Sequence, residues 1–282
     1  MSKQTRYDKV DILGVNIDVI SLSEAIEYIC TYATDHAKPA AYVVKPYVEF
    51  LDRAAGNPEL TTRLNEAELA IADGVAVIWA AHYLYAGPRT FWRFWVTLAQ
   101  IVAAPRNLEW PLQERAAGVT FTWPLLKAAA AADMRVYIIG KETTAEIELV
   151  ISRIIREIPD ILIAGASSGR DQRVPRGQVS PAWITQTTAR IAATKADLIL
   201  VGMGFPLQEH VCAQLAQQLD HGVFIGEGGT FDYESFGGVR RKAPASVQRI
   251  GFEWLWRLAL EPKRIIRQLA IPRYLYRIWK SR

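Results

Sequence analysis

Four polar segments of the chain follow short apolar runs that are typical of buried β-strands. They comprise residues 45–47, 73–74, 140–144 and 202–208. In an open parallel sheet the ligand crevice lies at the carboxyl ends of the strands, where loops lead into helices. We therefore expect these four loops to meet at one edge of a sheet and to form the functional site.

Asp73 is the candidate for acid–base chemistry. It follows the apolar run Leu69–Ala72 and precedes Gly74, a position from which a carboxylate can project into the crevice and act as a general base. Asp is also a favoured residue at a helix N-cap. Taken alone, these residues favour the cap, and both interpretations stay open at this point.

The segment from Gly202 to Glu209 has the composition of an anion-binding loop. Gly202 and Gly204 permit close backbone approach. Pro206 suits the first turn of a helix, and the polar Gln208 and Glu209 follow it. Exposed amides at such a helix start would attract a diphosphate, although loops of this kind also occur for structural reasons alone. The dinucleotide fingerprint G-x-G-x-x-G is not present.

A second glycine-rich segment, Gly226–Asp232, also follows an apolar run. Its glycines can serve a tight turn. Asp232 is equally compatible with a cap on the next segment and with contact to a substrate.

Nothing in the sequence predicts a metal site. His82, His210 and His221 lack the spacing of metal ligands, so ordinary core or surface roles are expected. No Asp-x-Asp triplet occurs, which removes the usual carboxylate pair that holds a metal on a sugar-nucleotide diphosphate. We therefore expect neither a metal nor a cofactor.

The elements that position these residues alternate between strands and helices. Val10–Ile20 predicts two short strands that turn near Gly14, and Ser21–Glu24 matches a capping box. The other apolar runs are short and polar only at their ends, as expected for strands buried on both faces. An α/β fold with an open, largely parallel sheet flanked by helices is predicted. The strands are expected at Ala41–Val44, Leu69–Ala72, Arg135–Ile139, Ile161–Ala164, Leu198–Val201 and Val223–Ile225, and helices over 48–55 and 143–158.

Two stretches fall outside this alternation. Residues 88–111 interleave Phe and Trp with arginines, and residues 240–282 contain twelve Lys or Arg against two Glu, a net charge of +10. The first 239 residues therefore carry −6 of the total of +4. Such a basic tail implies an anionic partner. We predict a catalytic α/β core over 1–239, with an aromatic and basic insertion at 88–111, and a basic helical appendage over 240–282.

The appendage predicts a membrane contact. From Ile265 to Trp279 apolar and basic residues interleave, and Pro272 is expected to kink this element or split it in two. Such an amphipathic element can lie among anionic lipid headgroups, with Tyr274 and Tyr276 at the interface. Packing of the tail on the core is equally compatible with its composition. We expect the tail to bind an anionic membrane surface.

Composition favours a cytoplasmic location. Cys30 and Cys212 lie far apart in segments expected to be helical, which argues against a disulfide framework. The polar start Met1–Asp11 is unlike a secretory signal, and no apolar run approaches the length that spans a membrane. A soluble or peripheral protein is expected. No nucleic-acid partner is predicted, and self-association is compatible with the sequence.

Five motifs occur in the order of a known family. They resemble the WecG/TagA/CpsF glycosyltransferases, also called glycosyltransferase family 26, and the resemblance covers about residues 8–270. The motifs are Asp73-Gly74, Gly202–Glu209, Gly226–Asp232, Arg241–Pro244 and Glu253–Arg257 with Glu261-Pro262.

The resemblance implies a Rossmann-like fold and an inverting, metal-independent glycosyltransferase, either a hexosyltransferase or an N-acetylhexosaminyltransferase. The donor would be a UDP-sugar and the acceptor a polyprenyl-diphosphate-linked sugar, used for cell-surface polysaccharide or teichoic-acid-type biosynthesis. The enzyme would lie on the inner face of the plasma membrane. The Asp of the family's Asp-Gly motif is its proposed base, which raises Asp73 above its capping interpretation.

The resemblance also implies substrate-binding residues. Gln208 and Glu209 match a Gln-Glu pair of the family, and Arg115 resembles its Arg-x-x-Gly segment. The family's C-terminal arginines, which are thought to reach the donor diphosphate, match Arg257, Arg264 and Arg267.

The chain departs from the family's pattern in two places. Lys45-Pro46-Tyr47 stands before Glu49, where the family commonly has Thr-x-Asn. Lys45 and Tyr47 are predicted to bind substrate, but they cannot make the same hydrogen bonds, so neither the sugar nor the acceptor follows from the sequence. The insertion 88–111 is also longer than the family's connection.

Two other function classes fit parts of the sequence. A nucleotide-dependent oxidoreductase or a sugar-nucleotide-modifying enzyme would use the same kind of sheet, but the glycine fingerprint is missing. A non-catalytic peripheral binder of membranes or nucleic acid would use the basic tail and its aromatic residues. Bound nicotinamide would identify an oxidoreductase, and binding without turnover would identify a non-catalytic protein.

Overall fold

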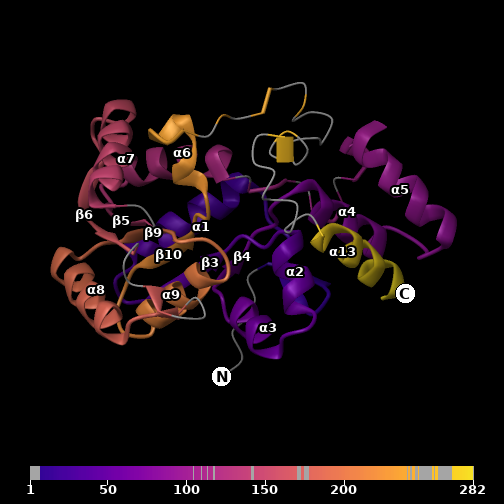
Figure 1. The fold of residues 1–282 in the computed structure, drawn as a ribbon, viewed down its shortest axis with the longest axis horizontal. Helices are drawn as coiled ribbons and strands as arrows, with labels where there is room; N and C mark the ends of the chain where they lie inside the picture. Colours follow the sequence, from indigo (N-terminus) through magenta and orange to yellow (C-terminus); the bar gives the residue numbers. More distant parts are fainter. Residues whose placement is uncertain are drawn as a thin grey trace.

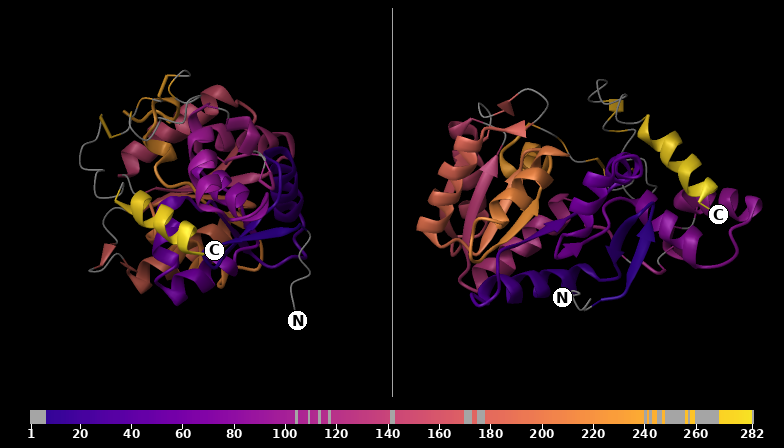
Figure 2. Two further views of the ribbon diagram at one scale, coloured as in Figure 1. Left: turned by 90° about the vertical axis from the view of Figure 1, so that its right-hand side faces the viewer. Right: turned by 90° about the horizontal axis from the view of Figure 1, so that it is seen from below.

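The computed structural model describes residues 7–103, 105–108, 110–112, 114–116, 118–140, 143–169, 173–174 and 178–239, together with 241, 243–244, 247, 256, 258–259 and 269–281. The described part is layered, with a central parallel sheet between two groups of helices (Figures 1 and 2). Helices α5 and α13 lie at one end of the long axis, away from the central sheet.

The central sheet has six strands, and all are parallel. They are β3 (Ala41–Val44), β4 (Leu69–Ala70), β5 (Arg135–Gly140), β6 (Leu162–Ser168), β9 (Leu198–Gly202) and β10 (Val223–Gly226). Their order is β4-β3-β10-β9-β5-β6, and each neighbouring pair is parallel. Because parallel strands end at the same edge, the loops that follow β4, β3, β10 and β9 lie side by side.

Successive residues of the strands face two different cores. In β9, Ile199 and Val201 belong to one buried cluster, and Leu198 and Leu200 belong to the other. All four side chains are completely buried. A strand covered on both faces has no position for a polar side chain, which explains its continuous apolar sequence.

Helices cover both faces of the sheet. Two of them begin at capping boxes, where Ser21 pairs with Glu24 and Thr143 pairs with Glu146. One face packs against α1 (Leu22–Thr34), α6 (Gly118–Ala131) and α7 (Thr144–Glu157). The other packs against α2 (Val48–Ala54), α3 (Pro58–Asn65), α4 (Val75–Tyr85), α8 (Pro181–Thr194) and α9 (Leu207–Ala216).

Two small antiparallel pairs accompany the main sheet: β1 (Lys9–Ile12) with β2 (Val15–Asp18), and β7 (Arg173–Val174) with β8 (Gln178–Val179). The buried Asp18 carboxylate joins the first pair to the main sheet, because its Oδ2 accepts the Ala70 N–H at 2.8 Å. This bond fixes the short strand β4, whose end leads to the candidate site.

The predicted α/β fold with a largely parallel sheet is confirmed. The hairpin that turns near Gly14, the Ser21–Glu24 capping box and the buried strands all form where they were expected. Two strands differ in length from the prediction. The strand before Asp73 is shorter than the predicted Leu69–Ala72, because β4 ends at Ala70. The strand predicted at Ile161–Ala164 is longer, because β6 extends to Ser168.

The 88–111 insertion is mainly helical. It contains α5 (Phe91–Ala103), followed by the 3-10 helix η1 (Pro105–Leu108). The buried Phe94 packs edge-on against Trp79 of α4, with 5.3 Å between the ring centroids. The opposite side of α5 carries apolar residues that are exposed, namely Phe91, Trp92, Trp95 and Val96. Among the described helices, none is both long and apolar enough to cross a bilayer.

The described end of the appendage is the helix α13 (Ala270–Lys280), which packs on the core. Its Tyr274 and Ile278 side chains are completely buried. Asp52 of α2 is only 3 % exposed and forms ion pairs with two arginines of α13, Arg273 at 2.8 Å and Arg277 at 3.1 Å. A buried carboxylate needs such partners to offset its lost hydration, so this contact fixes the position of α13.

One expectation about the appendage is corrected here. Tyr274 does not lie at a lipid interface, because it is buried and its hydroxyl donates to Ala76 O at 3.2 Å. Pro272 lies in the first turn of α13, where its missing N–H leaves no intrahelical bond unmade, and the described helix begins at Ala270, two residues before the proline. Tyr276 is 57 % exposed. The earlier part of the predicted element, residues 265–268, lies outside the described residues.

We predict that Asp52→Asn loosens α13. Removing the charge weakens the bonds to both arginines, each worth about 1.5–3 kcal/mol when an ionised group takes part. Hydrogen exchange of the α13 amides should therefore be faster than in the wild type. Glu59→Gln is the control, since its ion pair with Arg63 involves a carboxylate that is 80 % exposed and should contribute little. Equal protection of α13 in Asp52→Asn and the wild type would contradict the prediction.

Candidate active site

Asp73 lies where three segments meet at the carboxyl edge of the sheet. Its N–H donates to Pro46 O at 2.9 Å, and the Ala116 N–H donates to Ala72 O at 2.8 Å. These bonds hold Asp73, which is half-buried, between the loop after β3 and the segment that carries Arg115. The structure therefore brings the predicted base close to two other predicted site segments.

The N-cap of α4 is Gly74, and the interpretation of Asp73 as this cap is wrong. Gly74 has φ of +94° and precedes Val75, the first residue of the helix. Such a left-handed backbone favours glycine. Asp73 thus stands one residue ahead of the cap, just before the N-terminus of α4.

A buried ion pair joins the loops after β3 and β10. Lys45 Nζ lies 2.9 Å from Glu227 Oε2, and the two side chains are 6 % and 0 % exposed. Thr122 of α6 donates its hydroxyl to the same carboxylate oxygen at 2.6 Å. The ammonium also lies 5.2 Å from the centre of the Phe121 ring, within range of a cation–π contact.

This ion pair limits what Lys45 can do. Because Glu227 already offsets its charge, Lys45 could bind a substrate phosphate only by sharing or exchanging its carboxylate partner. Glu227 Oε1 is buried and has no hydrogen-bond partner within the described part of the chain. An acceptor in that state is ready to receive a donor group.

Gln208 connects the loops after β9 and β10. Its Oε1 accepts the N–H of Gly204 at 3.1 Å and the N–H of Gly228 at 2.8 Å. Its amide donates to Glu209 Oε1 at 2.8 Å. The Gly204 amide, in the segment that we expected to attract a diphosphate, is therefore occupied by this buried side chain, as is the Gly228 amide of the neighbouring loop.

Glu209 is fully enclosed beside Gln208. Burial raises the pKa of Glu209 to about 7, against weaker lowering by its hydrogen bonds and nearby cations. The folded protein therefore keeps this carboxyl protonated above about pH 4.5, where the unfolded chain has released the proton. The stability that the bound proton contributes is lost as the pH rises through 7. Gly226 makes room for the pair, because a Cβ there would lie 2.6 Å from Gln208 Nε2.

The loop after β3 continues into a second chain of polar contacts. The Tyr47 hydroxyl donates to Glu49 Oε2 at 2.7 Å, and Arg53 lies 2.8 Å from Glu49 Oε1. Glu49 is buried, whereas about half of the Arg53 side chain is exposed. Tyr47 is thereby oriented by its own helix α2 and stays partly accessible beside the Asp73 loop.

The structure describes only some of the remaining predicted site residues. Gly202 is tightly covered, since a Cβ would lie 2.5 Å from the Phe231 ring. Asp232 is half-buried in η4 (Thr230–Asp232), and the following 3-10 helix takes Tyr233 as its N-cap, so Asp232 is not that cap. The predicted diphosphate ligands Arg257, Arg264 and Arg267 lie outside the described residues.

Two residues of the site were missed from the sequence. Glu227 stands inside the Gly226–Asp232 motif directly after an apolar run, a signal that could have identified it. Thr122 lies within α6 and has no local signal, because its role depends on a partner 105 residues away.

The chain is similar to a known protein family over most of its length. The model of the "Glycosyl transferase WecG/TagA/CpsF family" matches residues 10–93 and 99–282, and the gap between them falls within α5. Relatives from Staphylococcus aureus strains NCTC 8325 and MRSA252 are each 27 % identical, over 285 and 286 residues. Each match covers 100 % of this chain and 96 % of the relative, which is named N-acetylglucosaminyldiphosphoundecaprenol N-acetyl-beta-D-mannosaminyltransferase.

We predict that Lys45→Met destabilises the protein by about 3–5 kcal/mol, because it leaves the Glu227 carboxylate buried without its counter-ion. The double variant Lys45→Met with Glu227→Gln should recover much of this loss, since neither charge then remains. Urea unfolding of the two single variants and the double variant measures the coupling. Additive losses would show that the two side chains do not stabilise each other.

Proposed function

Because the chain belongs to the WecG/TagA/CpsF family and is therefore a glycosyltransferase, we propose that it moves a sugar from a UDP-sugar to a polyprenyl-diphosphate-linked acceptor with inversion at the anomeric carbon. The family favours this function over the oxidoreductase and the non-catalytic binder. The names of the Staphylococcus aureus relatives support an undecaprenyl-diphosphate-linked N-acetylglucosamine as acceptor and N-acetylmannosamine as the transferred sugar.

The observation that carries the proposal is the position of Asp73. It is a half-buried carboxylate at the carboxyl edge of a parallel sheet, it is not the cap of α4, and it adjoins the Arg115 segment. As the base, Asp73 takes the proton of the acceptor hydroxyl while that oxygen attacks the anomeric carbon. The bond to the nucleotide diphosphate breaks on the opposite face.

The leaving diphosphate needs positive charge as the bond breaks. We propose that Arg115 and the three arginines Arg257, Arg264 and Arg267 supply it in place of a metal ion. The buried pair of Lys45 and Glu227 supports this arrangement, because it leaves the loop after β3 with little net charge of its own. Tyr47, Gly202, Gly204, Gln208, Glu209 and Asp232 would shape the surrounding substrate pocket.

The membrane is the expected location of a lipid-linked acceptor, and two helices at one end of the molecule suit it. The outer side of α5 exposes Trp92 by 75 % and Trp95 by 52 %, and α5 contains no acidic residue. The end of α13 lies beside the insertion, where Arg89 Nη1 donates to Ser281 O at 2.9 Å (Figure 2). We propose that this end rests on the anionic inner face of the plasma membrane.

The appendage contributes less charge to this contact than its composition suggested. Arg273 and Arg277 form ion pairs with Asp52, which offsets part of their charge. In this proposal the other basic residues of the tail supply most of the attraction to anionic lipid. The exposed aromatic residues of α5 add an apolar contribution that is not screened by salt. In this proposal α5 and the tail share the membrane contact.

The proposed reaction is tested by measuring release of UDP from a panel of UDP-sugars, including UDP-N-acetylmannosamine. The acceptor is a short-chain polyprenyl-diphosphate-N-acetylglucosamine. Release that depends on the acceptor, and equal rates with chelator and with added Mg²⁺ or Mn²⁺, are expected. A strict requirement for either metal would overturn the arginine scheme, and no acceptor-dependent release with any donor would overturn the function.

We predict that Asp73→Asn lowers turnover by roughly 10²–10⁴, the usual contribution of a general base. The free energy of unfolding should change little, because Gly74 and not Asp73 is the helix cap. Asp160→Asn, at an exposed turn distant in sequence, serves as the control for removal of one acidic charge. Near-normal turnover of Asp73→Asn would rule out this residue as the base.

We predict that the double variant Trp92→Ser and Trp95→Ser weakens binding to phosphatidylglycerol vesicles by about tenfold or more, since burial of each large apolar side chain contributes roughly 1.5–3 kcal/mol. Both side chains are exposed, so folding should be unaffected. The matched control is Leu149→Ser on α7, whose side chain is 61 % exposed. Unchanged sedimentation of the double variant with vesicles would exclude α5 from the contact.

A further inference from the structure

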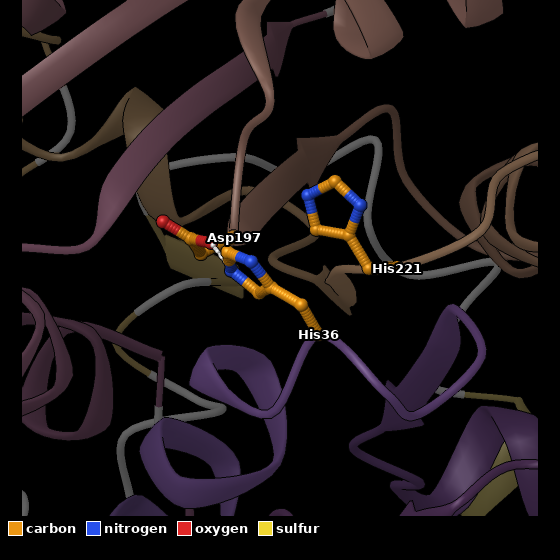
Figure 3. Close-up of side chains that lie close together, drawn as sticks. All are labelled: His36, Asp197 and His221. Atoms are coloured by element: carbon orange, nitrogen blue, oxygen red, sulfur yellow. Dashed lines mark hydrogen bonds and ion pairs between the residues drawn. The ribbon is translucent and has the colours of Figure 1, made fainter.

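Three potential metal ligands meet at the amino edge of the sheet, away from the candidate active site. They are His36, Asp197 and His221, and one ligand atom from each lies within 4.8 Å of the other two. Figure 3 shows the His36 imidazole beside the Asp197 carboxylate and the His221 ring close by, and the two rings are tilted by 42° to each other. His36 Nε2 is 2.9 Å from Asp197 Oδ1, and the ring centroids of the histidines are 4.8 Å apart.

Backbone hydrogen bonds hold two of these residues in place. Asp197 immediately precedes β9, and its N–H donates to Arg135 O at 2.8 Å. The Val223 N–H, at the start of β10, donates to Asp197 O at 2.8 Å. His221 is joined to this edge through Gly222, where φ is +106° and a Cβ would lie 3.0 Å from Ala196 O. The ligand positions are thus set by the ends of adjacent strands.

His36 reaches the cluster from the turn that follows α1. In this turn the Lys38 N–H donates to Asp35 O at 2.9 Å, and the Ala37 N–H donates to Asp35 Oδ1 at 3.2 Å. The His36 side chain is 62 % exposed, whereas the Asp197 side chain is 8 % exposed. An ion could therefore reach the cluster from solvent and meet a carboxylate that is already oriented.

Two features of the cluster point to a ligand. His221 Nε2 is buried and has no hydrogen-bond partner within the described part of the chain, a state that ordinarily requires an explanation such as an ion or a water molecule. The second oxygen of Asp197 accepts the Arg135 N–H at 2.8 Å. This bond orients the carboxylate from behind, as outer partners of metal ligands do.

We propose that His36, Asp197 and His221 bind a divalent transition-metal ion, with Zn²⁺ as the best fit. Two imidazoles and one carboxylate form a donor set typical of zinc, while Mg²⁺ and Ca²⁺ prefer oxygen ligands alone. Three protein ligands leave one position open to solvent on the exposed side of His36. Small side-chain rotations bring atoms now up to 4.8 Å apart to zinc-binding distances.

The site would be structural and separate from sugar transfer. Asp73 and Glu227 follow the carboxyl ends of their strands, whereas Asp197 and His221 precede the amino ends of β9 and β10. An ion here would tie the turn after α1 to both strands. The ligands are distant in the sequence, since His36 and Asp197 are 161 residues apart, and therefore no short motif predicts them.

The proposal is tested by titrating ZnCl₂ into the full-length, tag-free protein after treatment with a chelator, using calorimetry. We expect one zinc ion per chain and a higher Tm in the presence of zinc, because a ligand that binds only the folded state stabilises it. His36→Ala should weaken binding by more than the roughly 10–100-fold that loss of an outer partner costs. MgCl₂ at the same concentration should produce no binding.

His82→Ala is the matched control, because His82 lies on α4 and contacts Trp110 O instead of the cluster. It should bind zinc like the wild type. His36 is the deciding position, since its exposed side chain can be removed without disturbing the core, and His221→Gln provides the second test. Zinc affinity that is unchanged in His36→Ala, or a wild-type protein that binds no zinc, would overturn the proposal.

Discussion

The buried contact between Lys45 and Glu227 is the interaction on which the candidate active site depends. Neither charge could be left alone in this interior, where both side chains are almost inaccessible to water. Their mutual attraction therefore joins the loops after β3 and β10, and Thr122 adds α6 to the same carboxylate. The loops that present Asp73 and Gln208 are built around this fixed point.

Much of the fold could be predicted because its signals are local. Buried strands appear as short apolar runs, and Ser21 with Glu24 identifies a helix start from four consecutive residues. The position of Asp73 at a strand end also follows from neighbouring residues. The resemblance to a family then favoured a role as base over a role as cap, which the residues themselves did not do.

The parts that could not be predicted depend on partners distant in the sequence. Lys45 and Glu227 are 182 residues apart, and Asp52 and Arg273 are 221 residues apart. Composition showed that the tail is basic, but it could not show that Arg273 is held by a buried carboxylate. The helix α5 in the insertion was likewise not predicted, since the insertion was identified only by its aromatic and basic composition.

The outward face of α5 bears on how self-association of this protein should be interpreted. Phe91, Trp92, Trp95 and Val96 form an exposed apolar surface that water solvates poorly. In buffer without lipid or detergent, the surface most readily available to cover it is the same face of another copy. In the proposed arrangement a bilayer covers this surface, so a dimer measured without lipid is not by itself evidence that catalysis requires two chains.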